Sequence, residues 1–155
     1  MSDTTITATP GGYEVVIKRE FNATKDKVFE AYNDPELFVQ WIGPSALTTK
    51  IDSWDAVPGG KWRYVSKDSD GNEYGFHGYY HDIVENERIV QTFEFEGMPG
   101  RASLNAVKFE ENNGKTMVTS VAVFENQEDR DGMLSSGMER GVNQGYDRLT
   151  ALLEK

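Results

Sequence analysis

The segment EDRDGMLSSGMERGVNQGYDRLTALL, residues 128–153, determines the architecture that the rest of the chain can adopt. Apolar side chains recur along it at spacings of three and four, at Leu134, Met138, Val142, Tyr146, Leu149 and Leu153. This spacing is typical of an amphipathic helix. We therefore predict one helix of roughly 25 residues and about 37 Å, with an apolar side that needs a surface to cover.

Residues 46–126, which precede this helix, alternate between apolar and polar side chains with a period of mostly two. The pattern is interrupted by turn sequences at Pro58-Gly59-Gly60, Ser69-Asp70-Gly71-Asn72 and Asn112-Asn113-Gly114. Residues 13–21 (YEVVIKREF) are also rich in β-branched and aromatic residues and predict a first strand. Because the links are short, we expect six to seven strands that pair antiparallel.

Two short helices are expected after the first strand. Thr24 suits a helix N-cap, and Asn33-Asp34-Pro35 both ends this helix and starts the next, since proline suits a first helical turn. The order of elements predicts an α+β fold of the helix-grip type. One curved antiparallel sheet buries its apolar face against the long C-terminal helix, the only element long enough to cover it.

The composition is that of one acidic domain. The chain has 155 residues, no cysteine, two histidines and a formal net charge of -10. We expect a flexible N-terminal tail over residues 1–12 and a single domain over residues 13–155. The negative charge disfavours nucleic acids, and the lack of an apolar run in MSDTTITATP argues against a signal peptide or membrane span. A cytoplasmic protein is expected.

Metal sites and cofactors have little support in the sequence. His77 and His81 are four residues apart on a predicted strand, so they stand about 13 Å apart, too far to chelate one ion together. Both lie on the face opposite Phe76 and Tyr80 and are expected at the surface. The acidic residues of 125–131 suit the start of a helix better than a calcium loop. We expect no metal and no cofactor.

Catalytic motifs are also missing from the sequence. It contains no Gly-x-Ser-x-Gly elbow, and Gly59-Gly60-Lys61 lacks the remaining spacing of a phosphate-binding loop. An enzyme would have to use carboxylates, tyrosines or a bound water in an apolar pocket. Four side chains could contribute to such chemistry if they face inward: Arg19, Arg63, Asp82 and Glu94.

Four motifs, in this order along the chain, resemble a known family. They are Asp34-Pro35-Glu36 with Trp41-Ile42-Gly43-Pro44, Pro58-Gly59-Gly60 before Trp62, Glu96-Gly97-Met98-Pro99-Gly100, and DRDGMLSSGMERG over residues 129–141. The chain resembles the START/SRPBCC superfamily, and within it the homologues of the activator of heat-shock protein ninety ATPase, over roughly residues 13–153. The resemblance implies a cavity between the sheet and the long helix that takes an apolar or amphipathic small molecule.

Candidate ligand-binding residues follow from strand alternation and from this resemblance. They are Phe38, Trp41, Trp62, Tyr64, Phe76, Tyr80, Phe93, Asn105, Met133, Gly137, Met138, Gly141 and Val142. Gly137, Gly141 and Gly145 form one helical stripe that either widens the space above the sheet or allows close packing. Two methionines at helical spacing are more often plain core, and about half of the aromatics are expected to be simple core. Many family members have tryptophan after the glycine of Gly141-Val142 and an apolar residue in place of Asn105, so this chain would have a larger cavity with an amide on its wall.

Three functions remain open at this point. The first is a small-molecule binding domain with a largely apolar cavity. The second is a cavity enzyme of the cyclase, hydrolase or isomerase type. The third is an interaction module that activates a chaperone ATPase, as the family name suggests; it is the weakest, because eukaryotic activators usually carry an additional domain for which this length leaves no room.

Overall fold

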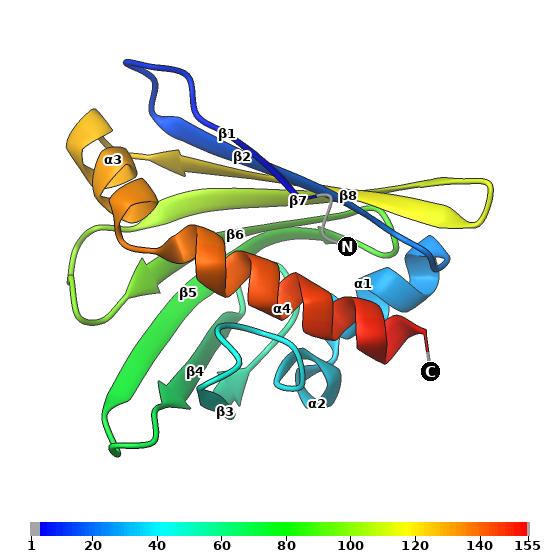
Figure 1. The fold of residues 1–155 in the computed structure, drawn as a ribbon, viewed down its shortest axis with the longest axis horizontal. Coiled ribbons are helices and arrows are strands. Elements are labelled where there is room, and N and C mark those ends of the chain that lie inside the picture. Colours follow the sequence, from blue (N-terminus) through cyan, green and yellow to red (C-terminus); the bar gives the residue numbers. More distant parts are fainter. Residues whose placement is uncertain (1–3, 155) are drawn as a thin grey trace.

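One open antiparallel sheet of eight strands forms the body of the computed structural model, which describes residues 4–154 (Figure 1). The spatial order of the strands is β1-β2-β8-β7-β6-β5-β4-β3. In chain order the strands are β1 (Thr5–Thr7), β2 (Glu14–Phe21), β3 (Thr48–Trp54), β4 (Lys61–Lys67), β5 (Glu73–Val84), β6 (Arg88–Phe95), β7 (Ser103–Asn112) and β8 (Lys115–Phe124).

Four helices accompany the sheet within the described residues: α1 (Lys25–Asn33), α2 (Pro35–Phe38), α3 (Gln127–Ser135) and α4 (Met138–Leu153). Figure 1 shows α4 lying across the inner, concave face of the sheet, with α1 and α2 beside its C-terminal half. The predicted helix-grip architecture is therefore confirmed. No helix among residues 4–154 is long and apolar enough to cross a membrane.

The eighth strand is β1, which lies within the segment expected to be an N-terminal tail. Thr5–Thr7 pair antiparallel with β2, with Ile6 opposite Ile17, and form one edge of the sheet. The first three residues of the expected tail lie outside the described residues. The other seven strands coincide with the predicted β segments.

The prediction of a single C-terminal helix is wrong, because the helix is broken at Gly137. This residue has a φ of 88°, a left-handed conformation that favours glycine and interrupts an α-helix. The hydroxyls of the two preceding serines donate hydrogen bonds to carbonyl oxygens of α3. Ser135 donates to Gly132 O at 3.2 Å, and Ser136 donates to Met133 O at 2.6 Å. The apolar spacing continues across the break, so the periodicity alone does not reveal it.

Two arginines fasten α4 to the rest of the molecule. The buried Arg19 of β2 forms a 3.0 Å ion pair with Asp147 and donates to the Thr150 hydroxyl at 3.0 Å. Its guanidinium also lies 5.9 Å from the centre of the Tyr146 ring. Arg148 donates to Gln40 O at 2.9 Å, which holds the segment after α2 against the same helix. These contacts fix the C-terminal half of α4.

Gly145 brings α4 into direct contact with the backbone that follows α2. A Cβ atom at this position would lie 2.9 Å from Trp41 O, closer than real Cβ contacts allow. Gly145 therefore serves close packing, one of the two roles considered for the glycine stripe. Below it, Leu149 is fully buried at 0% exposure.

Leu149→Ala should destabilise the fold by about 2–5 kcal/mol, because it leaves a cavity at the centre of the helix–sheet contact. Leu104→Ala is the matched control, since Leu104 is 47% exposed on the outer face and its truncation should change stability by no more than about 0.5 kcal/mol. Urea denaturation measures both. Equal midpoints for the two variants would contradict the assigned position of Leu149.

Candidate functional site

Aromatic side chains gather on the inner face of the sheet. Cross-strand pairing places Trp54 opposite Trp62, and Tyr64 opposite Phe76. Side-chain alternation places Tyr80 and Phe93 on the same face, as the sequence predicts. With Phe38 of α2, which packs against this face, these residues form what we call the aromatic cluster: Phe38, Trp54, Trp62, Tyr64, Phe76, Tyr80 and Phe93.

The rings of the aromatic cluster are in direct contact. Trp62 and Tyr64 stack with their centroids 5.5 Å apart and their planes at 19°, and Tyr64 and Phe76 stack at 5.1 Å and 27°. Phe38 meets Tyr64 edge-on at 5.3 Å. Each such pair contributes about 0.5–1.5 kcal/mol beyond its buried area. The cluster is thus one continuous layer of aromatic rings on β3, β4, β5 and β6, with Phe38 of α2 packed on it.

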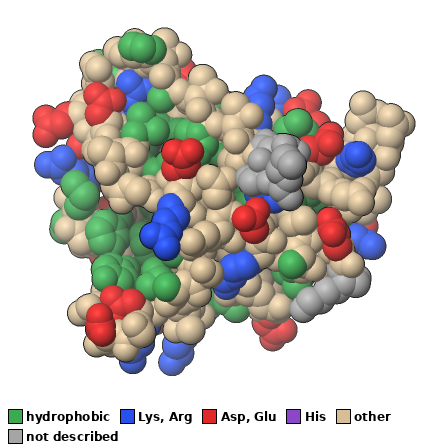
Figure 2. Space-filling view, viewed as in Figure 1, with side chains coloured by type: hydrophobic (Ala, Val, Ile, Leu, Met, Phe, Trp, Pro, Cys, Tyr) green, Lys and Arg blue, Asp and Glu red, His purple; other side chains and the backbone are tan. Residues whose placement is uncertain are grey.

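Helices α3 and α4 cover the aromatic cluster incompletely. Phe76 and Phe93 on the strands, Met133 on α3, and Met138 and Val142 on α4 all pack against the core but remain partly exposed. Figure 1 shows α3 turning away from the line of α4 at the break, and Figure 2 shows hydrophobic side chains at the surface over β5 and β6, beside the start of α4. These five residues form an open apolar surface.

The indole N–H of Trp62 has no hydrogen-bond partner, although the residue is only 2% exposed. The other two tryptophans differ in this respect. Trp41 donates to Ala31 O and Trp54 donates to Asn33 O, both at 2.9 Å. A buried donor without an acceptor costs about 1–3 kcal/mol, so the Trp62 N–H is a feature that needs an explanation.

Two tyrosine hydroxyls of the aromatic cluster also lack partners among residues 4–154. Burial alone raises the pKa of Tyr64 and the pKa of Tyr80 well above the ordinary phenol value. By contrast, the buried hydroxyls of Tyr32 and Tyr146, in the core under α4, lie 3.3 Å from each other. Within residues 4–154, the cluster therefore contains one buried donor without a partner, the Trp62 N–H, and two tyrosine hydroxyls that make no hydrogen bond to the protein.

A row of polar side chains continues from the aromatic cluster across the inner face. Tyr80 pairs with Gln91, Gln91 with Asn105, and Asn105 with Ala122 on adjacent strands. Asn105 accepts from the Ser103 hydroxyl at 2.8 Å, which leaves its amide NH₂ available. Asn105 thus lies on the inner face. Gln91 was missed in the sequence, although it shares strand parity with Ile89 and Phe93.

The inner face carries almost no charge. The register of β2–β8 places there only the paired Arg19 and, at the far end of β7, Glu111. Arg63, Asp82 and Glu94 lie on the outer face, opposite the aromatic cluster. These three residues could support catalysis in the pocket only if they faced inward, and they face outward. Within residues 4–154, no group of three His, Asp or Glu side chains is placed to hold a metal ion.

Three predicted site residues, Trp41, Gly137 and Gly141, are not part of the open apolar surface. Trp41 is 2% exposed and packs its ring against Tyr32 and Tyr146. At Gly141 a Cβ atom would meet Pro44 Cγ at 3.4 Å, so this glycine faces the loop after α2 and does not widen the space above the sheet. Gly137 has a left-handed backbone conformation and separates α3 from α4.

Two hollows of the described surface also lie elsewhere. One is bordered by Arg19, Asn22 and Thr150, at the end of α4. The other is bordered by Arg63, Tyr74 and Glu96, at the margin of the sheet. Neither lies between α4 and the aromatic cluster, where the sequence predicts a cavity.

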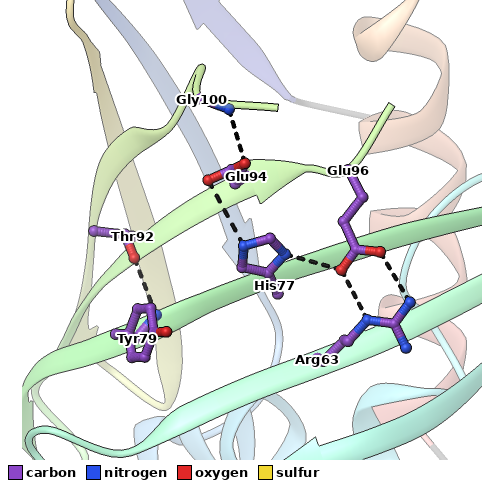
Figure 3. A network of polar contacts seen from close by, with 7 residues as sticks. All are labelled: Arg63, His77, Tyr79, Thr92, Glu94, Glu96 and Gly100. Carbon is purple, nitrogen blue, oxygen red and sulfur yellow. Dashed lines mark hydrogen bonds and ion pairs between the residues drawn. The ribbon is translucent and has the colours of Figure 1, made fainter. Parts of the chain in front are cut away.

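A polar network on the outer face of the sheet borders the second hollow (Figure 3). Arg63 makes a bidentate pair with Glu96, with Nε–Oε2 and Nη2–Oε1 distances of 2.7 and 2.8 Å. His77 lies between Glu96, at 2.9 Å, and Glu94, at 3.6 Å. Glu94 in turn accepts from the Gly100 N–H at 2.9 Å. The network joins β4, β5 and β6 to the loop after β6, which is a structural role.

Acid should weaken this network through Glu96. The hydrogen bond from Arg63, supported by His77, lowers the pKa of this carboxyl from 4.5 to about 2. A lowered folded-state pKa stabilises the fold above the unfolded value and loses this effect as the pH falls through the folded value. The melting-temperature gap between wild type and Glu96→Gln should thus shrink as the pH falls from about 5 toward 2. Glu110→Gln, on the exposed outer face of β7, controls for loss of charge. A gap that does not change with pH would contradict the role of Glu96.

Several solved structures share this fold over nearly the whole chain. Protein Ms6760 from Mycobacterium smegmatis is 23% identical, with a TM-score of 0.87 over 97% of this chain and 96% of that one. A Staphylococcus epidermidis protein is 26% identical, with a TM-score of 0.82 over 97% and 93%. The AHSA1 protein from Silicibacter pomeroyi is 20% identical, with a TM-score of 0.74 over 91% and 97%. Curated proteins give no match.

The sequence also matches a family model over most of its length. The model describes the Activator of Hsp90 ATPase homolog 1-like proteins and matches residues 22–154, from the end of β2 to the last turn of α4. This range includes the aromatic cluster, the helix break and the open apolar surface. The chain therefore belongs to the family of Activator of Hsp90 ATPase homolog 1-like proteins.

Proposed function

We propose that this protein binds an apolar or amphipathic small molecule between the inner face of the sheet and the α3–α4 junction. The open apolar surface is the observation that supports the proposal. Phe76, Phe93, Met133, Met138 and Val142 lie against the core yet remain partly exposed. A molecule seated there would remove apolar area from water, at about 25 cal/mol per Å².

The composition of this surface suits a binding site. Ligand sites combine apolar and aromatic walls with a few placed polar groups, and here the aromatic cluster adjoins the Gln91–Asn105 row. Met133 and Met138 supply flexible side chains that adapt to the shape of a ligand. The family is consistent with a ligand-binding helix-grip domain. We expect the protein to act in the cytoplasm.

The two alternative functions have less support. An enzyme of the cyclase, hydrolase or isomerase type would have to rely on tyrosine hydroxyls or a bound water, because the register of β4–β7 places no carboxylate or histidine beside the aromatic cluster. The only support for a chaperone-activating function is the description of the family. Binding is therefore the function that we put forward.

The binding test uses N-phenyl-1-naphthylamine, a neutral apolar probe that fluoresces when it leaves water. The wild-type protein should take it up and gain about 2.7 kcal/mol of stability at a hundredfold excess over the dissociation constant. Ala122→Phe places a ring on the inner face beside Asn105 and should weaken uptake at least about fivefold, a loss of about 1 kcal/mol. Fluorescence titration and thermal melts provide the measurements.

Val123→Phe is the matched control, because Val123 is the next residue on β8, faces outward and is 43% exposed. It should bind the probe like the wild type. A wild type that takes up no probe, together with an Ala122→Phe variant destabilised by about 1–3 kcal/mol, would instead indicate a fully packed interior. That result would rule out binding at this site.

A further inference from the structure

We infer that the protein pairs with a second copy of itself through the outer face of the sheet, with the two sheets packed face to face about a twofold axis. The inference is independent of the proposed function, because the proposed ligand site lies on the inner face. Three features of the outer face support it: a band of apolar side chains, a row of cations along one side of this band, and carboxylates along the other side.

The apolar side chains cross four neighbouring strands. Cross-strand pairing joins Val16 to Val121, Val121 to Ala106 and Ala106 to Val90, and in the next row it joins Val123 to Leu104. We call these six residues the apolar band: Val16, Val90, Leu104, Ala106, Val121 and Val123. The outer face of an open antiparallel sheet usually carries polar side chains. A continuous apolar surface there indicates an interaction site.

The apolar band is separate from the core beneath the helices. Val90 is only 4% exposed but is not part of the core cluster, and Val16, Ala106 and Val121 do not pack against that cluster. Figure 1 shows α1, α2 and α4 on the concave inner side of the sheet. On the other side, Leu104 and Val123 are 47% and 43% exposed. The band is therefore accessible to a partner.

The cations occupy the next row of the outer face and form what we call the basic band: Lys18, Arg88 and Lys108. Lys18 and Lys108 pair with Thr119 from either side, and Arg88 lies directly opposite Lys108. Like charges in directly opposed positions destabilise a sheet. Arg88 is compensated by Asp82 at 3.3 Å, whereas Lys18 and Lys108 form no ion pair among residues 4–154. Carboxylates from a partner would stabilise this row.

Such carboxylates lie on the other side of the apolar band. Glu14 pairs with Val123, and Glu94 lies two residues beyond Thr92 along β6, on the same face. A half-turn about an axis in the face, perpendicular to the strands, lays the apolar band of one copy on that of the other and exchanges the two sides. It places each basic band over the partner's edge that carries Glu14 and Glu94. A half-turn about an axis along the strands would place basic band on basic band, so charge selects the first arrangement.

The alternation of charge favours a second copy over a uniformly acidic partner or an anionic membrane. Beyond the basic band, Glu20 and Glu110 pair with Met117 from either side. A uniformly negative surface would meet these carboxylates as well as Glu14, whereas a second copy presents both signs. This argument is strengthened by the overall charge of -10, which repels anionic surfaces.

The area of the face suits a weak dimer. Five strands, from β2 to β5 in spatial order, span about 24 Å, and eight residues along a strand span about 27 Å, which gives roughly 650 Å² per copy. Stable interfaces bury about 800 Å² per partner, and sheets that pack face to face lie about 10 Å apart with aligned strands. Because both copies carry a net negative charge, we expect association at micromolar concentrations.

Sedimentation velocity over a concentration series tests the pairing. The wild type should change from monomer to dimer with a dissociation constant of about 10–100 μM. Leu104→Glu places a charge within the apolar contact and should weaken association at least about a hundredfold. Lys18→Glu and Glu14→Lys should each weaken it about tenfold, because each brings like charges together across the axis. The double variant exchanges the two charges and should restore association to within about threefold of the wild type.

Val57→Glu and Lys67→Glu are the matched controls for an added acid and for a reversed charge. Val57 is 49% exposed in the loop between β3 and β4, and Lys67 is exposed at the end of β4. Both variants should dimerise like the wild type, and circular dichroism melts at low concentration show whether every variant is folded.

A wild type that stays monomeric up to about 1 mM, ten times the weakest expected dissociation constant, would overturn the inference. A dimer that survives Leu104→Glu, or one that the double exchange does not restore, would also overturn it. A monomer that binds vesicles of phosphatidylglycerol, and loses this binding in Lys18→Glu, would assign the basic band to a membrane and overturn the pairing.

Discussion

The contact between the C-terminal half of α4 and the inner face of the sheet is the constraint on which the rest of the structure depends. An open sheet has one apolar face that must be covered, and Tyr146 and Leu149 cover it where Arg19 and Arg148 hold the helix in place. Gly145 lets the backbones approach closely at the same point. The other end of α4 begins at the Gly137 break, and there Met138 and Val142 remain partly exposed.

Much of the fold could be predicted from local sequence patterns. Alternation predicted seven of the strands and grouped Trp62 with Tyr64, and Phe76 with Tyr80, because strand parity depends only on neighbouring residues. The helix break was hidden, since the apolar spacing runs through Gly137 and only its backbone conformation reveals the interruption. Pairings between distant residues were hidden as well. Arg63 and Glu96 are 33 positions apart, and local sequence patterns do not predict the strand register that brings them together.

The candidate site was predictable in outline and less so in detail. Parity brought Trp62, Tyr64, Phe76, Tyr80 and Phe93 to one face, and Asn105 also lies there. Gly141 faces Pro44 in the loop after α2, a contact between distant segments that periodicity cannot anticipate. The missing partner of the Trp62 N–H could be found only in three dimensions.

The anchoring of α4 by Arg19 also has a consequence for how the chain folds. Arg19 and Thr150, which its guanidinium contacts, are 131 residues apart, and β2 pairs with β8, which ends at Phe124. Contacts between such distant segments slow folding because a long loop must close before they form. During synthesis the first long strand therefore has no lateral partner in the main body of the sheet until nearly the whole chain has emerged from the ribosome. The nascent protein exposes an unpaired strand edge for most of its translation, a state in which chaperone protection is most valuable.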